Sequence, residues 1–369
     1  MRVTVVDTAA DSGGALSILM DFYRYVLQHG QAHRWTFVLG AAALPDAPHI
    51  TVLRYPGAKR SWAARLAFDV LTLPRVVADT RPDAVLSLQN LAVLRQRVPQ
   101  VIYMHQPLPF VTDIKRYALW RRGETRYALY QRVYGGLMAR SARAAVFCVA
   151  QTRYMADALA QRAGIAPERV RKIAPSIDIP SGQPPAIADG ETVRTRRFLY
   201  PAAYYPYKNH TCAVQAARLL LAGGTADFEI VFTLPPGLRP VLGAEDLPCV
   251  RFSGPIPRDE LLRQMRESAL LFPSYIESYG MPVAEARALG SPVLAADTGF
   301  SRELLAGYPN ARFFDPFSPQ AMADAMAAVL TGKMAYRTES PQERAESASA
   351  WARVVGLLEE AAVKIGLSR

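Results

Sequence analysis

Short runs of β-branched and aromatic residues alternate with amphipathic stretches along the first 175 residues of the chain. Such runs predict strands, and longer stretches with a helical hydrophobic period predict helices. The predicted strands are Val3–Asp7, Trp35–Leu39, Ile50–Arg54, Ala84–Leu88, Val101–His105, Ala145–Val149 and Val170–Ala174. The predicted helices are Gly13–His29, Ser61–Asp79, Tyr117–Arg140 and Thr152–Ala163. Regular alternation of this kind predicts βαβ units on a parallel sheet.

A segment rich in proline, glycine and arginine interrupts the alternation, and it predicts a linker over residues 181–197. The alternation then restarts. The predicted strands are Phe198–Ala203, Phe228–Leu234, Val250–Ser253, Leu270–Pro273, Pro292–Ala296 and Phe313–Phe314. The predicted helices are Lys208–Ala222, Arg258–Glu267, Gly280–Leu289 and Pro319–Leu330. Residues 341–369 predict closing helices that can pack back toward the N-terminal domain.

The pattern therefore predicts two α/β domains, residues 1–180 and 198–340, each a Rossmann-like parallel sheet covered by helices. The length of 369 residues agrees, because domains usually contain about 100–200 residues. Open parallel sheets bind ligands at the carboxyl ends of their strands. We therefore expect a cleft between the carboxyl ends of the two sheets.

The composition is typical of a globular protein, with 50% hydrophobic and 20% charged residues. No apolar run approaches the roughly 18 residues that a membrane-spanning helix needs. Asp7 precedes any apolar core of a signal peptide, so export is not expected. Cys148, Cys212 and Cys249 are too scattered for a disulfide framework or a zinc motif. We expect a location in the reducing cytoplasm.

The positive charge is unevenly distributed along the chain. Residues 1–188 contain 24 Lys and Arg against 12 Asp and Glu, whereas residues 189–369 contain 19 against 20. A basic domain beside a neutral one predicts an anionic partner for the first domain. An anionic membrane surface or a phosphate-bearing lipid would fit. Nucleic acid is the alternative, although no helix-turn-helix, zinc-finger or RRM motif supports it.

Residues 113–143 combine this charge with aromatic side chains: Tyr117, Trp120, Tyr127, Tyr130 and Tyr134. Aromatic residues with arginines on a helix are typical of a membrane headgroup interface. They would also fit single-stranded nucleic acid, or an ordinary surface helix with buried aromatics. We expect peripheral binding at the inner face of the cytoplasmic membrane. The residues expected on this membrane or acceptor side are Lys115, Arg116, Trp120, Arg121, Arg122 and Arg126.

Two glutamates eight residues apart are the strongest candidates for binding chemistry. Glu277 falls in the loop after a predicted strand, and Glu285 lies inside the following helix, which Gly280 and Pro282 open. A helix N-terminus offers free N–H groups and a positive dipole end to a phosphate. The two carboxylates can then bind hydroxyls on either side of that phosphate. The alternative is a pair of solvated glutamates.

The segment around these glutamates resembles the E-x7-E signature of the family-four group of retaining GT-B glycosyltransferases. Pro273-Ser274 before it also matches, as does the continuation from Leu289 through Phe300 to Glu303-Leu304. The resemblance implies that Glu285 binds the ribose hydroxyls of a nucleotide and that Glu277 binds the donor sugar. It further implies that the donor diphosphate or sugar contacts the loop and helix start formed by Ser278, Tyr279, Gly280, Met281 and Pro282.

A second matching segment places a lysine at a helix start. Lys208 follows a Pro/Tyr loop after a predicted strand, where its ammonium group can neutralise a leaving diphosphate. In the family this place carries an arginine and a lysine, both on the phosphates. Lys208 matches the lysine, but the arginine position falls on Ala203, so the usual basic pair is incomplete.

The N-terminal half contributes two further candidates. Gly13 and Gly14 follow the first strand and open a helix, and the family has a comparable glycine loop facing the donor. His105 ends a strand before a proline-rich loop, where the family often places a histidine near the donor sugar and acceptor. A plain turn and a structural histidine are the corresponding alternatives.

Together with these features, the resemblance implies a retaining glycosyltransferase with a UDP- or GDP-linked sugar donor and no cofactor. The acceptor would be a glycan or polyprenyl-diphosphate-linked molecule of cell-surface polysaccharide synthesis, as in O-antigen, capsule or exopolysaccharide. The sequence has no Asp-x-Asp triplet, so metal-independent transfer is expected, with catalytic roles for His105, Lys208 and Glu277. The alternatives are an epimerase or phosphorylase-like enzyme of the same fold, or a non-catalytic binding protein, which Ala203 would favour.

Overall fold

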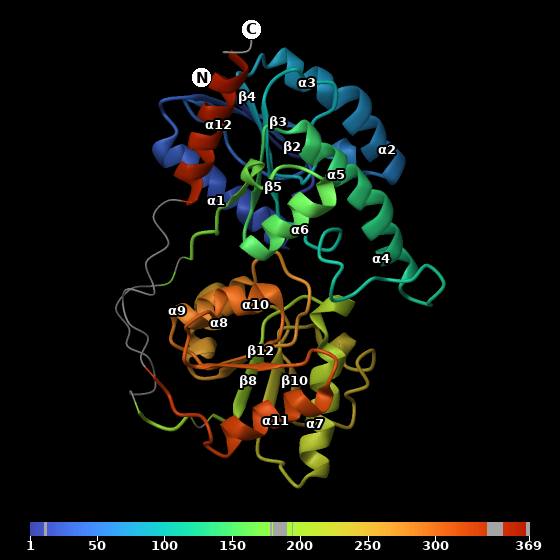
Figure 1. The fold of residues 1–369 in the computed structure, drawn as a ribbon, viewed down its shortest axis with the longest axis vertical. Helices are drawn as coiled ribbons and strands as arrows, with labels where there is room; N and C mark the ends of the chain where they lie inside the picture. Colours follow the sequence, from blue (N-terminus) through green and yellow to red (C-terminus); the bar gives the residue numbers. More distant parts are fainter. Residues whose placement is uncertain (11–12, 178, 180–189, 194, 338–349, 367–369) are drawn as a thin grey trace. The chain divides into compact units, whose positions relative to one another are not determined.

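A computed structural model describes residues 1–10, 13–177, 179, 190–193, 195–337 and 350–366. The chain divides into two compact units. The first contains the described residues up to Ser176 together with the C-terminal helix, and the second contains those from Ile177 to residue 337. Each is an α/β unit with an all-parallel sheet, so the predicted fold class, two Rossmann-like parallel-sheet domains, is confirmed (Figure 1).

The first unit is built on a seven-stranded sheet of order β3-β2-β1-β4-β5-β6-β7. The strands are β1 Arg2–Asp7, β2 Arg34–Leu39, β3 Ile50–Arg54, β4 Ala84–Ser87, β5 Gln100–Met104, β6 Phe147–Ala150 and β7 Val170–Lys172. Every residue of β4, β5 and β6 is buried, as expected for strands covered on both faces.

Helices cover both faces of this sheet. They are α1 Gly13–His29, α2 Trp62–Ala67, α3 Leu73–Asp79, α4 Thr125–Leu129, α5 Gly135–Ala144, α6 Arg153–Ala163 and α12 Ala350–Gly366. Leu19 and Phe22 of α1 pack with Val5 of β1, and Leu73 of α3 packs with Val6 on the opposite face. Two π-helical turns, Phe68–Thr72 and Tyr130–Tyr134, join α2 to α3 and α4 to α5.

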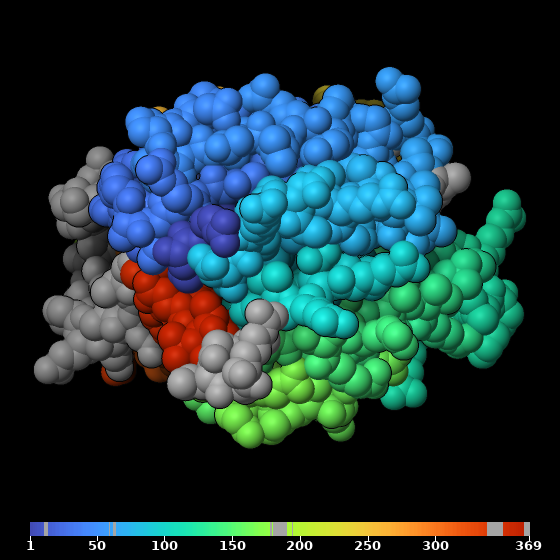
Figure 2. Space-filling view, turned by 90° about the horizontal axis from the view of Figure 1, so that it is seen from above, coloured from blue at the N-terminus to red at the C-terminus, as the bar shows by residue number. Residues whose placement is uncertain are grey.

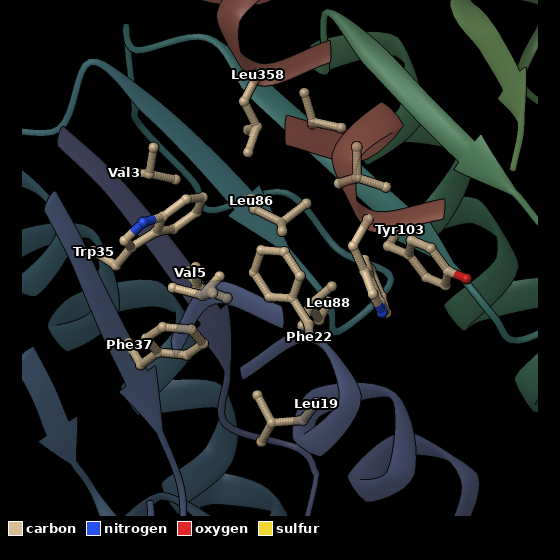
Figure 3. Close-up of a cluster of buried hydrophobic side chains, with 14 of the residues drawn as sticks. Val3, Val5, Leu19, Phe22, Trp35, Phe37, Leu86, Leu88, Tyr103 and Leu358 are labelled. Carbon is tan, nitrogen blue, oxygen red and sulfur yellow. The ribbon is translucent and has the colours of Figure 1, made fainter. Parts of the chain in front are cut away.

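The last described helix, α12, completes the core of the first unit. It contacts β4, β5 and β6, and its Trp351, Val354 and Leu358 are buried among residues from the start of the chain. Trp351 lies 4.9 Å from the ring of Phe22, and its indole Nε1 donates to Asp21 Oδ2 at 2.7 Å. Figure 3 shows Leu358 on the same side of the sheet as Phe22 and Trp35. In Figure 2 the red atoms of α12 lie beside blue and green atoms from much earlier residues.

The second unit has a six-stranded sheet of order β10-β9-β8-β11-β12-β13. The strands are β8 Arg197–Tyr200, β9 Glu229–Phe232, β10 Val250–Phe252, β11 Ala269–Phe272, β12 Val293–Ala296 and β13 Ala311–Phe314. The helices are α7 His210–Ala222, α8 Arg258–Arg266, α9 Met281–Ala288, α10 Gly299–Leu304 and α11 Pro319–Leu330. A short 3₁₀ turn, Pro206–Lys208, precedes α7, and a second, Pro236–Leu238, follows β9.

Each sheet has one point where the strand order reverses. Strands β1 and β4 are neighbours in the first sheet, and β8 and β11 are neighbours in the second, although neither pair is consecutive in sequence. Connections leave these neighbours toward opposite sides of the sheet, so their carboxyl ends border a natural crevice. The loops after these four strands therefore hold the positions where ligands of doubly wound sheets bind.

The helix expected over Tyr117–Arg140 is wrong at its beginning, because α4 starts only at Thr125. Gly123 has a left-handed φ of 83°, which breaks a helix. Glu124 holds the preceding loop, since its carboxylate accepts from the backbone N–H of Ala118 at 2.8 Å and lies 3.2 Å from Lys115 Nζ. The expected helix over 208–222 begins later too, at His210, after Asn209 in the left-handed region.

Candidate functional site

Lys208 and Glu277 meet at the carboxyl ends of β8 and β11. Lys208 ends the 3₁₀ turn after β8, and Glu277 lies in the loop between β11 and α9. The Lys208 ammonium Nζ forms an ion pair with Glu277 Oε1. Both side chains are mostly buried, at 18% and 13% exposed. Two residues selected separately from the sequence, 69 positions apart, are therefore in direct contact.

Hydrogen bonds hold the two loops against each other. Tyr200 at the end of β8 donates its hydroxyl to the backbone oxygen of Lys208 at 2.6 Å. The backbone N–H of Tyr275 donates to the carbonyl of Tyr207 at 3.0 Å. The Asn209 amide donates to the carbonyl of Pro273, just after β11, at 3.4 Å, and to that of Pro316, just after β13, at 2.6 Å. Because both loops are fixed, Lys208 and Glu277 are preorganised rather than free side chains.

Glu285 forms a second ion pair deeper in the same unit. It lies on α9 with its side chain 4% exposed, and it accepts a 2.6 Å hydrogen bond from Arg258 Nη1 at the start of α8. Burial raises the pKa of the Glu285 carboxyl, and the Arg258 guanidinium partly offsets that rise. The sequence analysis missed Arg258, which lies 27 residues earlier and belongs to no motif in the chain.

The loop and helix start between the two glutamates are tightly packed around Gly280. This residue caps α9 with φ 95° and ψ 58°, a conformation that favours glycine. A Cβ atom here would lie 3.3 Å from Phe300 Cε2. Tyr279 is buried, whereas Ser278, Met281 and Pro282 are partly exposed. The first turn of a helix leaves N–H groups without intrahelical partners, so this terminus suits an anion.

His105 belongs to the first unit, where it follows β5 beside Asn90, which follows β4. The Asn90 amide oxygen accepts from the backbone N–H groups of His105 at 2.7 Å and Gln106 at 3.1 Å. The Asn90 amide nitrogen lies 3.2 Å from His105 Nε2. Burial lowers the pKa of His105 to about 4, so the imidazole is neutral near pH 7. Asn90 was not predicted as a site residue.

The glycine loop of the first unit is described only in part. Gly13 and Gly14 open α1 as expected, while the two residues before them, Asp11 and Ser12, lie outside the described residues. At the reversal point between β1 and β4, Gln89 Oε1 accepts from Thr8 Oγ1 at 2.9 Å and from Arg65 Nη2 at 3.0 Å. Thr8, Arg65 and Gln89 are polar residues that the sequence analysis did not select.

The two π-helical turns bring further polar groups to this unit. Tyr130 and Tyr134 stack with ring centroids 4.7 Å apart. Burial raises the pKa of Tyr134. The charge of Arg65 lowers this pKa, and the charge of Asp69 raises it. Arg65 Nε lies 2.7 Å from Asp69 Oδ2.

In residues 113–143, the burial of the aromatic side chains differs from what the sequence predicts. Tyr117 and Tyr127 are buried with ring centroids 5.1 Å apart, so they cannot act as membrane anchors. Trp120, in contrast, is 81% exposed. Exposed apolar side chains instead recur every four positions along α4, the π-helical turn and α5: Leu129, Val133 and Leu137.

Most of the Lys and Arg side chains expected on the membrane or acceptor side are exposed to solvent. Arg116, Arg121, Arg122 and Arg126 are exposed. Lys115 is the exception, since it is paired with Glu124 and 26% exposed. Within the described ranges, no helix is both long enough and apolar enough to cross a membrane, and no three His, Cys, Asp or Glu side chains gather as metal ligands would.

Two glycosyltransferase family models match most of the chain between them. Residues 12–181 match Glycosyltransferase Family 4, and residues 242–351 match Glycosyl transferases group 1. The second match contains Glu277, Gly280 and Glu285, and the first contains Asn90 and His105. The chain thus carries one segment of each type: the first match lies mostly in the first unit, and the second match lies mostly in the second unit.

Curated relatives are similar over part of their length. A D-inositol 3-phosphate glycosyltransferase of Xylanimonas cellulosilytica is 28% identical over 201 residues, 49% of this chain and 48% of that protein. One of Streptomyces bingchenggensis is 31% identical over 236 residues, 57% of this chain and 49% of that protein. The chain therefore spans about half the length of these relatives.

Solved structures share the fold over nearly the whole chain. HepE of Anabaena, in complex with UDP and glucose, has a TM-score of 0.65 at 18% identity, covering 97% of this chain and 99% of that one. WaaG, a glycosyltransferase involved in lipopolysaccharide biosynthesis, has a TM-score of 0.64 at 17% identity, covering 98% of both chains. These likenesses establish a GT-B fold.

Proposed function

We propose that this protein is a retaining glycosyltransferase that moves a sugar from a nucleoside-diphosphate donor to a glycan or lipid-linked acceptor. The observation that carries the proposal is the Lys208–Glu277 ion pair at the reversal point between β8 and β11, beside the N-terminus of α9. A cation, a carboxylate and a helix terminus supply complementary groups for a sugar diphosphate.

The ion pair also suggests how the donor is bound. In the free protein Glu277 neutralises Lys208, so a mostly buried cation has a partner. When a diphosphate enters, its charge competes for the Lys208 ammonium, and the Glu277 carboxylate becomes free to accept hydrogen bonds from sugar hydroxyls. The positive end of α9 and Lys208 then stabilise the charge that develops on the departing diphosphate.

We propose a single-step transfer with retention, in which the acceptor approaches from the side on which the diphosphate leaves. The acceptor oxygen forms the new bond to the anomeric carbon as the bond from that carbon to the phosphate oxygen breaks. The acceptor proton passes to the departing phosphate oxygen. We propose that Lys208 and the start of α9 suffice to stabilise the leaving group without a metal ion.

The comparisons support a nucleotide sugar as donor. HepE has been solved with UDP and glucose and with UDP-glucose, and the curated relatives are named for sugar transfer to an inositol phosphate. We propose a UDP- or GDP-linked donor and an acceptor of cell-surface polysaccharide synthesis, for which the likeness to WaaG is the support. Such acceptors are commonly anchored in lipid, so the enzyme would work in the cytoplasm at the membrane surface.

The exposed surface of residues 115–137 fits that location. It combines Trp120, Leu129, Val133 and Leu137 with the exposed cations Arg116, Arg121, Arg122, Arg126 and Arg132. Apolar side chains enter the headgroup region, while arginines attract anionic lipid. We propose that this surface, here named the basic apolar surface, docks the first unit on an anionic membrane.

A donor panel tests the proposed activity. The purified protein is incubated with UDP-, GDP- and ADP-sugars, and its melting temperature is measured. One nucleotide class should stabilise it, by about 2.7 kcal/mol at a hundredfold excess over Kd. Failure of every nucleotide to shift the transition would overturn the proposal. Conversion of the donor without acceptor would indicate an epimerase, and a requirement for phosphate would indicate a phosphorylase.

A further inference from the structure

Asn90 occupies a position that few residue types could fill. It follows β4 with a left-handed φ of 64°, a conformation that asparagine tolerates better than most side chains. Its side chain is buried, with 8% of the residue exposed. Its amide contacts both the backbone and the side chain of the segment after β5, at His105 and Gln106. Asn90 therefore links the carboxyl ends of two adjacent strands, β4 and β5.

The two backbone contacts determine which way the Asn90 amide faces. The N–H groups of His105 and Gln106 are donors, so the atom that meets them must be the amide oxygen. The amide nitrogen consequently faces His105 Nε2 at 3.2 Å. That nitrogen can only donate, so Nε2 must accept and cannot carry a proton itself.

The protonation state of His105 follows from this contact. A neutral imidazole carries one proton, and with Nε2 accepting, that proton lies on Nδ1. His105 Nδ1 is buried and has no hydrogen-bond partner among the described residues. A buried N–H group without a partner is unfavourable, so a ligand oxygen that accepts from it would be bound selectively.

We propose that Asn90 is a positioning residue that holds His105 as the Nδ1–H tautomer, so that His105 donates a hydrogen bond to an oxygen of the bound substrate. In this arrangement Nε2 is occupied by Asn90 and does not serve as a base. The part of the proposal that concerns substrate rests on the glycosyltransferase function proposed above. The tautomer itself is a property of the free protein.

The tautomer is measured by the imidazole ¹⁵N shifts of uniformly labelled protein at pH 7.5, with His105→Ala identifying the resonances. The expected result is a protonated Nδ1 and an unprotonated Nε2. Asn90→Asp should reverse it, because the carboxylate still accepts from both backbone N–H groups but presents an acceptor to Nε2. A wild-type Nε2–H tautomer, or an unchanged tautomer in Asn90→Asp, would overturn the proposal.

Two further variants keep the measurement decisive. Asn90→Gly keeps the left-handed backbone and removes the amide, so the Nδ1–H preference should be lost even if Asn90→Asp does not fold. Asn310→Asp makes the same amide-to-carboxylate change in the second unit, where Asn310 bonds both the N–H and the carbonyl of Arg337. Asn310→Asp should leave the His105 resonances unchanged. A shift of these resonances in Asn310→Asp would show that the effect of Asn90→Asp is not specific to the contact with His105.

Turnover connects the tautomer to the reaction. Asn90→Asp should lower kcat at least about tenfold with a smaller change in donor KM, and adding it to His105→Ala should cost no more than His105→Ala alone. Additive losses would show that Asn90 does not act through His105. If the wild type turns over no donor, the proposed function fails, whereas the ¹⁵N result still decides the tautomer.

Discussion

Glu285 and Arg258 form an ion pair in which the acid is buried and the base is half exposed, with side chains 4% and 47% accessible and a 2.6 Å contact. Burial therefore disfavours the charged form of the Glu285 carboxyl, and the pKa of this group is raised. A protein optimised for stability alone would place a neutral side chain here. We interpret the buried carboxylate as a binding group for the ribose hydroxyls of the proposed donor.

Glu285→Gln should stabilise the free protein at pH 7.5. The pKa of Glu285 is higher in the folded state than in the unfolded state, so its ionisation favours unfolding as the pH rises. The gain in melting temperature should therefore shrink toward zero as the pH falls below the ordinary glutamate pKa. Glu285→Ala should weaken nucleotide binding by about 1.5–3 kcal/mol, measured by calorimetry. Unchanged affinity would contradict the ribose assignment.

The Lys208–Glu277 pair should behave as one unit in unfolding experiments. Lys208→Met or Glu277→Leu alone leaves a mostly buried partner uncompensated, at a cost of about 1–3 kcal/mol. The double variant should be more stable than either single variant, as measured by thermal unfolding. Equal, additive losses would show that the pair contributes little. Glu277→Ala should chiefly reduce transfer while nucleotide affinity is kept.

Chelation should leave the reaction nearly unchanged. If Lys208 and the α9 terminus carry the leaving-group charge, excess EDTA should alter the initial rate by less than about twofold. The comparison is made with freshly desalted enzyme and a saturating donor. An EDTA-abolished rate that manganese restores would refute metal-independent transfer.

Vesicle binding should depend on the basic apolar surface. Each cation near an anionic membrane contributes about 1 kcal/mol, so changing Arg121, Arg122 and Arg126 together to Ser should strongly weaken flotation with anionic vesicles at low salt. Nucleotide affinity should be unchanged. The matched control changes Arg75, Arg95 and Arg97 to Ser, removing three exposed charges elsewhere in the same unit. Equal binding by both triple variants, or no wild-type binding, would exclude local docking.

The stability of the first unit should decline below pH 6.5 because of His105. Its pKa is lowered to about 4 in the folded protein, so the unfolded chain takes up a proton first as the pH falls. The loss should reach about 2–3 kcal/mol near pH 4. His105→Gln should flatten this part of the pH profile of the first unit in urea unfolding, whereas buried His210, with a pKa of about 3, would affect the second unit. Parallel profiles for both proteins would refute the effect.

The sequence predicted the fold because the strands and helices depend on local patterns, and it selected the proposed donor-side residues for the same reason. The hydrophobic runs give the strands, and Glu277, Gly280 and Glu285 lie within one short segment. Sequence order also allowed Lys208 to be selected, since it follows a strand at a helix start. These features can be recognised from the sequence alone because each lies within about fifteen residues.

The contacts that could not be predicted join distant parts of the chain. Arg258 reaches Glu285 across 27 positions, and Asn90 reaches His105 across 15. Both depend on how loops leave neighbouring strands, which periodicity does not encode. The early helix start at Tyr117 was wrong for a related reason: the left-handed Gly123 and the contacts of Glu124 outweigh the local helical pattern.

The position of α12 has a consequence for the order in which the protein can be assembled. Trp351 contacts Asp21 across 330 positions, so the first sheet lacks this part of its core until residue 351 has left the ribosome. The second unit, whose described strands and helices lie between Arg197 and Leu330, is complete earlier. During synthesis Phe22 and Tyr103 therefore lack their final neighbour, Trp351, until after α11, the last described helix of the second unit, has been made.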